Sequence, residues 1–281
     1  MRFSSKTRYG VALAAFTAVA TLSLAAVAAD KIGNCEVTGK KGEFSIKPAI
    51  AGQLTYETNL PAPGWNNGDT PEAIKDGYEY CLAANIAWRL GLDKVVVKNV
   101  DFDALVAGQT KDFDIALSQI SITDKRKEVV QFSVPYFDSD VGVLAKKGKK
   151  VEAGDMKNLR IGVQQGTTGA DFVADTLKPK TPAKVFPDTP AMFTALMANQ
   201  IDVAMTDTAI VVPQAATSGG KQVVVGQYST GEKYGALFPK GAASAATIDK
   251  IIAALVADGT TKKLEKKYLA GDMSKIPAFK P

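Results

Sequence analysis

The sequence predicts an α/β protein whose sheets are covered by helices. Short apolar runs rich in β-branched residues alternate with amphipathic helical patterns along the chain, and this alternation is typical of that class. No internal repeat or low-complexity tract interrupts it. The 281 residues, 46% apolar and 22% charged, suffice for one large domain or two small ones. In such folds, ligands bind beyond the carboxyl ends of the strands.

Each element is predicted from its own periodicity. The predicted strands are short apolar runs, at 54–56, 95–100, 115–117, 141–145, 160–163, 201–205, 223–225 and 235–238. The predicted helices repeat apolar residues every three or four positions, at 78–90, 168–177, 190–198, 246–257 and 260–268. In the first helix, for example, Tyr78, Leu82, Ile86 and Leu90 share one face.

The first 29 residues read as a secretory signal peptide. A basic stub without acids precedes an apolar run to about Val27 that ends in small residues, so cleavage is expected near Ala28 or Ala29. A single membrane anchor is the alternative. It is less favoured because the run is rich in small Ala and Thr and no basic flank follows Asp30.

Cleavage would leave a nearly neutral chain. Three of the 34 basic residues and none of the 29 acidic ones lie in the signal peptide. The remaining 31 basic and 29 acidic residues give a net charge of +2. Such a charge gives no electrostatic reason to expect a nucleic-acid or membrane partner. Three arginines remain for any site that needs a guanidinium fork: Arg89, Arg126 and Arg160.

The chain contains no histidine and two cysteines. These counts exclude histidine-dependent catalysis, histidine-containing metal sites and thiolate zinc or iron–sulfur sites, so neither a metal nor a cofactor is expected. Two cysteines in an exported protein usually form a disulfide, so Cys35 and Cys81 are expected to pair. Two separate buried thiols remain the alternative, and a C-x-x-C redox motif is absent.

One long segment and five shorter ones carry a family resemblance. From Asp101 the chain reads DFDALVAGQTKDFDIALSQISITDKRKEVVQFSVPYF. The others are GYEYCLAANIAWRLGL (77–92), RIGVQQGTTGADF (160–172), IDVAMTDTAIV (201–211), YGALFPKG (234–241) and DGTTKKLEKKY (258–268). In this order, over about 54–271, they resemble the polar amino-acid-binding proteins of bacterial ABC importers, solute-binding protein family 3.

The resemblance implies a periplasmic, monomeric binding protein with the two-lobe type II fold. Lobe 1 would comprise 30–139 and 237–281, lobe 2 would comprise 140–236, and two crossing strands would form the hinge. The protein would capture an amino acid by hinge closure. It would then deliver the ligand to separate ABC permease and ATPase subunits at the inner membrane.

The matched positions also imply a ligand site. Arg126 and Ser121 would bind the α-carboxylate from lobe 1, and Thr168 would bind it from lobe 2. Asp207 would pair with the α-ammonium, with help from the Gln119 carbonyl. From the residues alone, Arg126 could instead be a surface arginine paired with Asp124 or Glu128. The threonine at 167–168 and Asp207 could be ordinary helix N-caps.

Three further positions concern the ligand's side chain. Trp65 and Phe102 match aromatic residues that sandwich the ligand's stem, although Phe102 could equally be plain core; Trp65, in a Gly- and Pro-rich loop, is harder to bury. At the position of Asn59, receptors for cationic amino acids tend to carry an acid. A neutral amide there would leave the charge of a lysine or arginine ligand uncompensated, which argues against these ligands. Gln119 replaces a small residue and could narrow the pocket. These features favour a neutral polar ligand such as glutamine.

Two alternative functions use the same fold. An exported enzyme, such as a cyclohexadienyl or prephenate-type dehydratase, would need a positioned acid or base, and no paired-carboxylate pattern points to one. The sensory domain of a receptor is the third possibility, although no signalling module follows the matched region before Pro281.

Overall fold

The computed structural model describes Met1, residues 30–269, Gly271 and residues 273–281. The predicted signal peptide lies outside these residues apart from Met1. The strands are β1 (Lys31–Ile32), β2 (Cys35–Glu36), β3 (Leu54–Thr58), β4 (Val95–Asn99), β5 (Ile115–Ala116), β6 (Val130–Lys146), β7 (Ile161–Gln164), β8 (Lys184–Phe186), β9 (Val203–Asp207) and β10 (Gln222–Pro239). The helices are α1 (Tyr78–Arg89), α2 (Phe102–Val106), α3 (Asp124–Lys127), α4 (Thr168–Phe172), α5 (Thr189–Met197), α6 (Thr208–Thr217), α7 (Ala245–Ala257) and α8 (Thr260–Tyr268). Short 3₁₀ turns lie at Ala153–Asn158 and Met273–Lys275, and a π turn at Val173–Leu177 extends α4.

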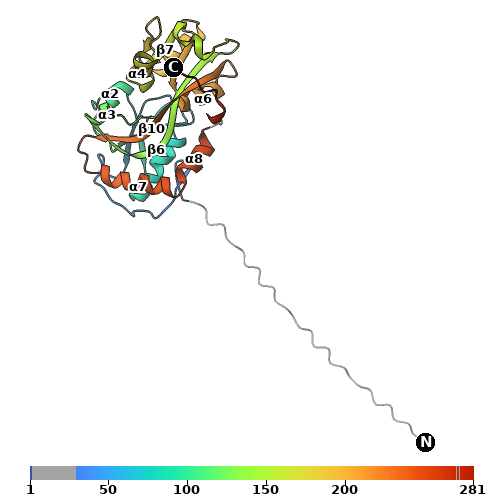
Figure 1. The fold of residues 1–281 in the computed structure, drawn as a ribbon. Helices are drawn as coiled ribbons and strands as arrows, with labels where there is room; N and C mark the ends of the chain where they lie inside the picture. Colours follow the sequence, from blue (N-terminus) through green and yellow to red (C-terminus); the bar gives the residue numbers. More distant parts are fainter. Residues whose placement is uncertain (2–29, 270, 272) are drawn as a thin grey trace.

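One mixed sheet joins two lobes. Its strand order is β4-β3-β5-β10-β6-β9-β7-β8. The strands β3 to β5 with α1, α7 and α8 form lobe 1, and β7 to β9 with α4, α5 and α6 form lobe 2. The long strands β6 and β10 pair antiparallel and run through both lobes (Figure 1). The predicted α/β fold with two lobes is confirmed.

Each lobe has its own core. In lobe 1, α7 buries Ile248, Ile251, Ile252 and Leu255, the three-four spacing of one helix face. Lobe 2 packs apolar residues on both faces of its strands, in two separate clusters. Strands covered on both faces are expected to be mostly apolar, and β9 is buried along its whole length, with Val203, Ala204 and Met205 before its two polar residues.

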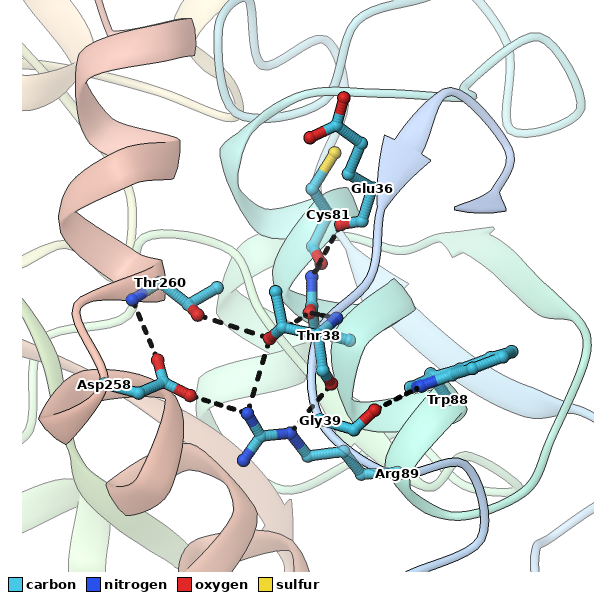
Figure 2. Close-up of polar contacts among 9 residues, drawn as sticks. Glu36, Thr38, Gly39, Cys81, Trp88, Arg89, Asp258 and Thr260 are labelled. Carbon is cyan, nitrogen blue, oxygen red and sulfur yellow. Dashed lines mark hydrogen bonds and ion pairs between the residues drawn. The ribbon is translucent and has the colours of Figure 1, made fainter. Parts of the chain in front are cut away.

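Hydrogen bonds and an ion pair hold the segment around Thr38 against α1 and the start of α8 in lobe 1 (Figure 2). Arg89, in the last turn of α1, is buried and donates to the Thr38 carbonyl at 3.2 Å and to the Asp258 carboxylate at 2.6 Å. The Thr38 hydroxyl bonds in turn to that of Thr260 at 3.3 Å. Arg89 therefore has a structural role. Cys35 and Cys81 are joined in a disulfide that ties the same segment to α1.

The structure also contains elements that periodicity did not predict. Strands β1, β2 and β8 have only two or three residues, and α2 has five, too few to show a period. Strands β6 and β10 are much longer than predicted, because polar residues at the lobe crossing interrupt the apolar pattern of each strand. Among the described residues, none of the helices is both long and apolar enough to span a membrane.

Candidate ligand-binding site

A cavity of about 400 Å³ lies between the two lobes. Lobe 1 contributes its wall from the ends of β3 and β5 and from α2 and α3; lobe 2 contributes from the end of β7 and from α4, α5, α6 and β9. The lining residues include Asn59, Trp65, Phe102, Gln119, Ser121, Arg126, Thr168 and Asp207. The cavity thus brings together all the ligand-binding residues predicted from the sequence. Arg126 and Asp207 are the charged residues among its described lining.

Arg126 is a buried cation without a carboxylate partner among the described ion pairs. Thr123 caps α3 by accepting from the Arg126 amide at 3.2 Å, which fixes the helix that carries the side chain. Arg126 is only 8% exposed, and its guanidinium donates to the Ser121 carbonyl at 2.7 Å and to the Gly166 carbonyl, in lobe 2, at 2.9 Å. Burial lowers the pKa of Arg126, yet an arginine stays protonated in proteins. The surface ion pair considered from the sequence does not form.

Asp207 stands at the end of β9 as a buried carboxyl group. Its side chain makes no cap bond to α6 and instead accepts from the Tyr234 hydroxyl at 2.5 Å. Burial, and next the nearby Glu232 carboxylate, raise the pKa of Asp207 to about 8, while the Tyr234 hydrogen bond and Arg126 oppose this rise. Asp207 thus occupies the N-cap position of α6, but its carboxyl group does not act as the cap.

Gln119 is held in a left-handed conformation by a buried acid. Its φ is 50°, and its amide donates to Glu79 at 2.8 Å. The Gln119 side-chain amide also donates to Glu79, as does the Tyr136 hydroxyl at 2.6 Å. Burial raises the pKa of Glu79 to about 7. The expectation that the Gln119 side chain would narrow the pocket is wrong, because its amide is turned to Glu79.

Ser121 and Thr168 converge on one carboxylate. Thr167 is the cap of α4 and accepts from the Ala170 amide at 3.1 Å, which leaves the Thr168 hydroxyl for other contacts. That hydroxyl donates to Glu232 Oε2 at 2.7 Å, and the Ser121 hydroxyl donates to the same oxygen. Glu232 lies on β10, where the sequence contains no motif that would have identified it.

Trp65 and Phe102 both line the cavity and are largely buried. Trp65 is 1% exposed, with its indole N–H donating to the Ala209 carbonyl at 2.9 Å and its ring packed edge-on against Tyr78, Phe137 and Tyr234. The expectation that Trp65 would be hard to bury is wrong, because aromatic residues distant in sequence surround it. The Phe102 ring lies 5.5 Å from the Arg126 guanidinium carbon, as in a cation–π contact.

Amides and apolar side chains complete the cavity. Asn59 donates to the Val100 carbonyl at 2.8 Å and accepts from Gln164, across the cleft, at 3.4 Å. Sequence periodicity did not indicate which further residues of lobe 2 face the cavity, because they are single positions on α5, α6 and β10 that meet only in the folded chain. These residues include Phe193, Met197, Ile210, Gln214 and Gln222.

Comparisons with known proteins agree with this architecture. Residues 69–271 match the family model of bacterial extracellular solute-binding proteins, family 3. The L-cystine-binding protein TcyA of Bacillus subtilis (strain 168) is 29% identical over 94% of this chain and 98% of its own. A probable histidine-binding protein of Neisseria gonorrhoeae is 30% identical over 83% of this chain and 89% of its own.

Solved structures show the same likeness. An ancestral arginine-binding protein bound to arginine superposes with a TM-score of 0.70 at 29% identity, over 78% of this chain and 99% of its own. The arginine-, lysine-, histidine-binding protein ArtJ from Geobacillus stearothermophilus gives 0.68 at 29% identity, over 80% and 96%. These relatives are binding proteins, in line with the resemblance in the sequence. The chain therefore belongs to family 3 of the bacterial extracellular solute-binding proteins.

Proposed function

We propose that the protein captures a free α-amino acid in the periplasm, in the cavity between its lobes, and presents it to an ABC permease in the inner membrane. The observation that carries this proposal is the pair of buried, opposite ionisable groups, Arg126 and Asp207, in one cavity. Neither has an ion-pair partner within 4.0 Å among the described residues. A buried charge is costly unless it is paired, and a zwitterion supplies both missing partners.

The proposed contacts divide the zwitterion between the lobes. Its carboxylate would lie on Arg126 with the Ser121 and Thr168 hydroxyls, and its ammonium would lie on Asp207 and the Gln119 carbonyl. Arg126 and Ser121 belong to lobe 1, whereas Thr168 and Asp207 belong to lobe 2. A ligand that touches both lobes stabilises the closed over the open arrangement, and this difference in affinity drives hinge closure.

We further propose that the ligand's side chain is neutral. The zwitterion uses both charged residues of the described lining, so a charged side chain would remain uncompensated in the cavity. The amides of Gln214 and Gln222, bonded to each other at 2.9 Å, offer polar contacts beside the apolar Met197 and Ile210. This arrangement suits a long, neutral ligand with hydrogen-bonding groups, such as glutamine or cystine.

A thermal-shift screen of the twenty L-amino acids and L-cystine tests the proposal. At 100 times its Kd a ligand stabilises by about 2.7 kcal/mol, which corresponds to a rise in Tm of about 5–10 °C. We expect such a rise with a neutral polar ligand and little change with arginine, lysine, aspartate or glutamate. A rise with arginine alone would contradict the neutral class. No rise with any compound would contradict the function, and turnover of prephenate would then test the exported enzyme.

Binding is expected to strengthen as the pH rises toward 8. Asp207 must be ionised to pair with an ammonium, but with a pKa of about 8 it is mostly protonated below that pH. One proton would leave on binding, so Kd should fall about tenfold between pH 6 and 7 and level off above pH 8. Calorimetry across this range measures the change. An Asp207→Asn variant should bind weakly and without this slope, and a flat wild-type profile would contradict the ion pair with Asp207.

A further inference from the structure

We infer that the Glu232 carboxylate is an internal competitor for the ligand's α-carboxylate; this inference rests on the proposed function. The Glu232 carboxylate accepts hydrogen bonds from the same hydroxyl groups that would donate to the ligand's carboxylate. Ser121, in lobe 1, and Thr168, in lobe 2, both donate to Glu232 Oε2. A single carboxylate oxygen thus joins the two lobes beside the ligand cavity.

The Ser121 and Thr168 hydroxyls cannot donate to Glu232 and to a ligand carboxylate at the same time. A serine or threonine hydroxyl has one proton, so it can donate one hydrogen bond at a time. While Ser121 and Thr168 donate to Glu232, neither can donate to a ligand carboxylate. Two carboxylates on the same donors would also repel each other. The ligand must therefore displace Glu232, and the lost contacts reduce the apparent affinity.

The local backbone holds Glu232 in this position. Between the pairs Tyr228↔Val141 and Glu232↔Ser139, strand β10 has three residues opposite one on β6, an excess of two. The Asp140 carboxylate accepts from the amides of Thr230 and Gly231 at 2.9 and 3.1 Å and so fixes this bulge. The Thr230 hydroxyl also lies 3.2 Å from Glu232 Oε1. A bulge commonly redirects a side chain, and this one aims Glu232 at the hydroxyl donors.

The inference predicts that removing the carboxylate tightens binding. The probe is the compound that gives the largest rise in Tm among L-glutamine, L-cystine and the other amino acids of the screen. In calorimetry above pH 8, where Asp207 is mostly ionised, Glu232→Gln and Glu232→Ala should lower Kd by about tenfold, because charge-assisted hydrogen bonds are lost from the ligand-free state only. Asp138→Asn is the matched control: it removes a β6 carboxylate that pairs with exposed Lys233, and it should change Kd less than about twofold.

Thermal unfolding separates competition from a merely structural role. Without ligand, Glu232→Ala should lower Tm by about 3–6 °C, the equivalent of the tenfold gain, whereas at saturating ligand it should match the wild type. Equal losses of Tm with and without ligand would show a structural role and overturn the inference. In a Ser121→Ala background, the gain from Glu232→Gln should shrink, since one of the contested donors is absent.

The two proposals fail in different ways. Binding of an amino acid with an unchanged or raised Kd in both Glu232 variants would overturn the competitor and leave the proposed function standing. No binding of any amino acid to the wild type or to the variants would overturn the proposed function, and the competitor with it. Tighter binding in both variants, with the control unchanged, would support both.

Discussion

Replacing Arg126 by alanine is expected to weaken amino-acid binding by about 2–5 kcal/mol, which is about 30- to 5,000-fold in Kd. The ligand carboxylate would enter the same cavity but find no cation there. Arg126 is the cation of the described lining, and its guanidinium already reaches both lobes through the Ser121 and Gly166 carbonyls. Alanine thus removes both the charge and a contact between the lobes. Calorimetry at pH 8 measures the loss.

Two further variants separate charge from geometry. Arg126→Lys keeps the positive charge without the planar fork and should bind with intermediate affinity. Arg160→Ala is the matched control, because Arg160 pairs with Asp202 at 3.0 Å, is 55% exposed at its side chain and does not line the cavity. Its Kd should remain close to that of the wild type. Unchanged affinity in Arg126→Ala would contradict the assignment of the carboxylate site.

Removing the disulfide is expected to lower the free energy of unfolding by about 4 kcal/mol. Cys35 and Cys81 are 46 residues apart in sequence, and the loop-entropy model gives about this value for a loop of that length. Urea unfolding of a Cys35→Ala/Cys81→Ala double variant measures it. Alanine is preferred to serine because both positions are buried, at 1% and 0% exposure, and a hydroxyl there would need a partner.

The disulfide experiment has two internal controls. Wild-type protein unfolded in the presence of a reductant should show a similar loss, since the same covalent link is absent. Ligand affinity of the folded double variant should stay close to that of the wild type, because neither cysteine lines the cavity. A loss below about 1 kcal/mol would contradict the expected contribution of loop closure.

Part of the candidate site could be predicted from local sequence. Arg126 and Asp207 were identified because each follows a strand and enters a helix within an ordered series of family motifs, and such positions meet at the ligand edge of an α/β sheet. The structure places both in the cavity. Thr168 was predicted from the family resemblance of its turn, and the structure adds that the neighbouring Thr167 caps α4 and leaves the Thr168 hydroxyl for other partners.

Other features depended on contacts that no local pattern reveals. Trp65 lies in a loop whose composition suggests exposure, yet its indole N–H reaches Ala209, 144 residues away in sequence. The Gln119 side chain points to Glu79 because that buried acid, 40 residues earlier, needs donors. Glu232 contacts Ser121 across 111 residues. Hydrophobic periodicity shows which face of a single helix or strand is buried. It does not show contacts between residues that are far apart in the sequence.

By itself, the sequence determined the α/β class and the charged residues available for a ligand, because these follow from residue identity and periodicity, and the order of its motifs carries the resemblance to the two-lobe family. Only the tertiary structure shows what the other two arginines do: Arg89 is bound to Asp258 and Arg160 to Asp202, so Arg126, the arginine that the family resemblance indicates, is the one that lines the cavity. The tertiary structure also places the Glu232 carboxylate within hydrogen-bond distance of the Ser121 and Thr168 hydroxyls. The physical reason is that β6 and β10 cross between the lobes, so that their pairing and bulges place side chains beside residues far away in the chain.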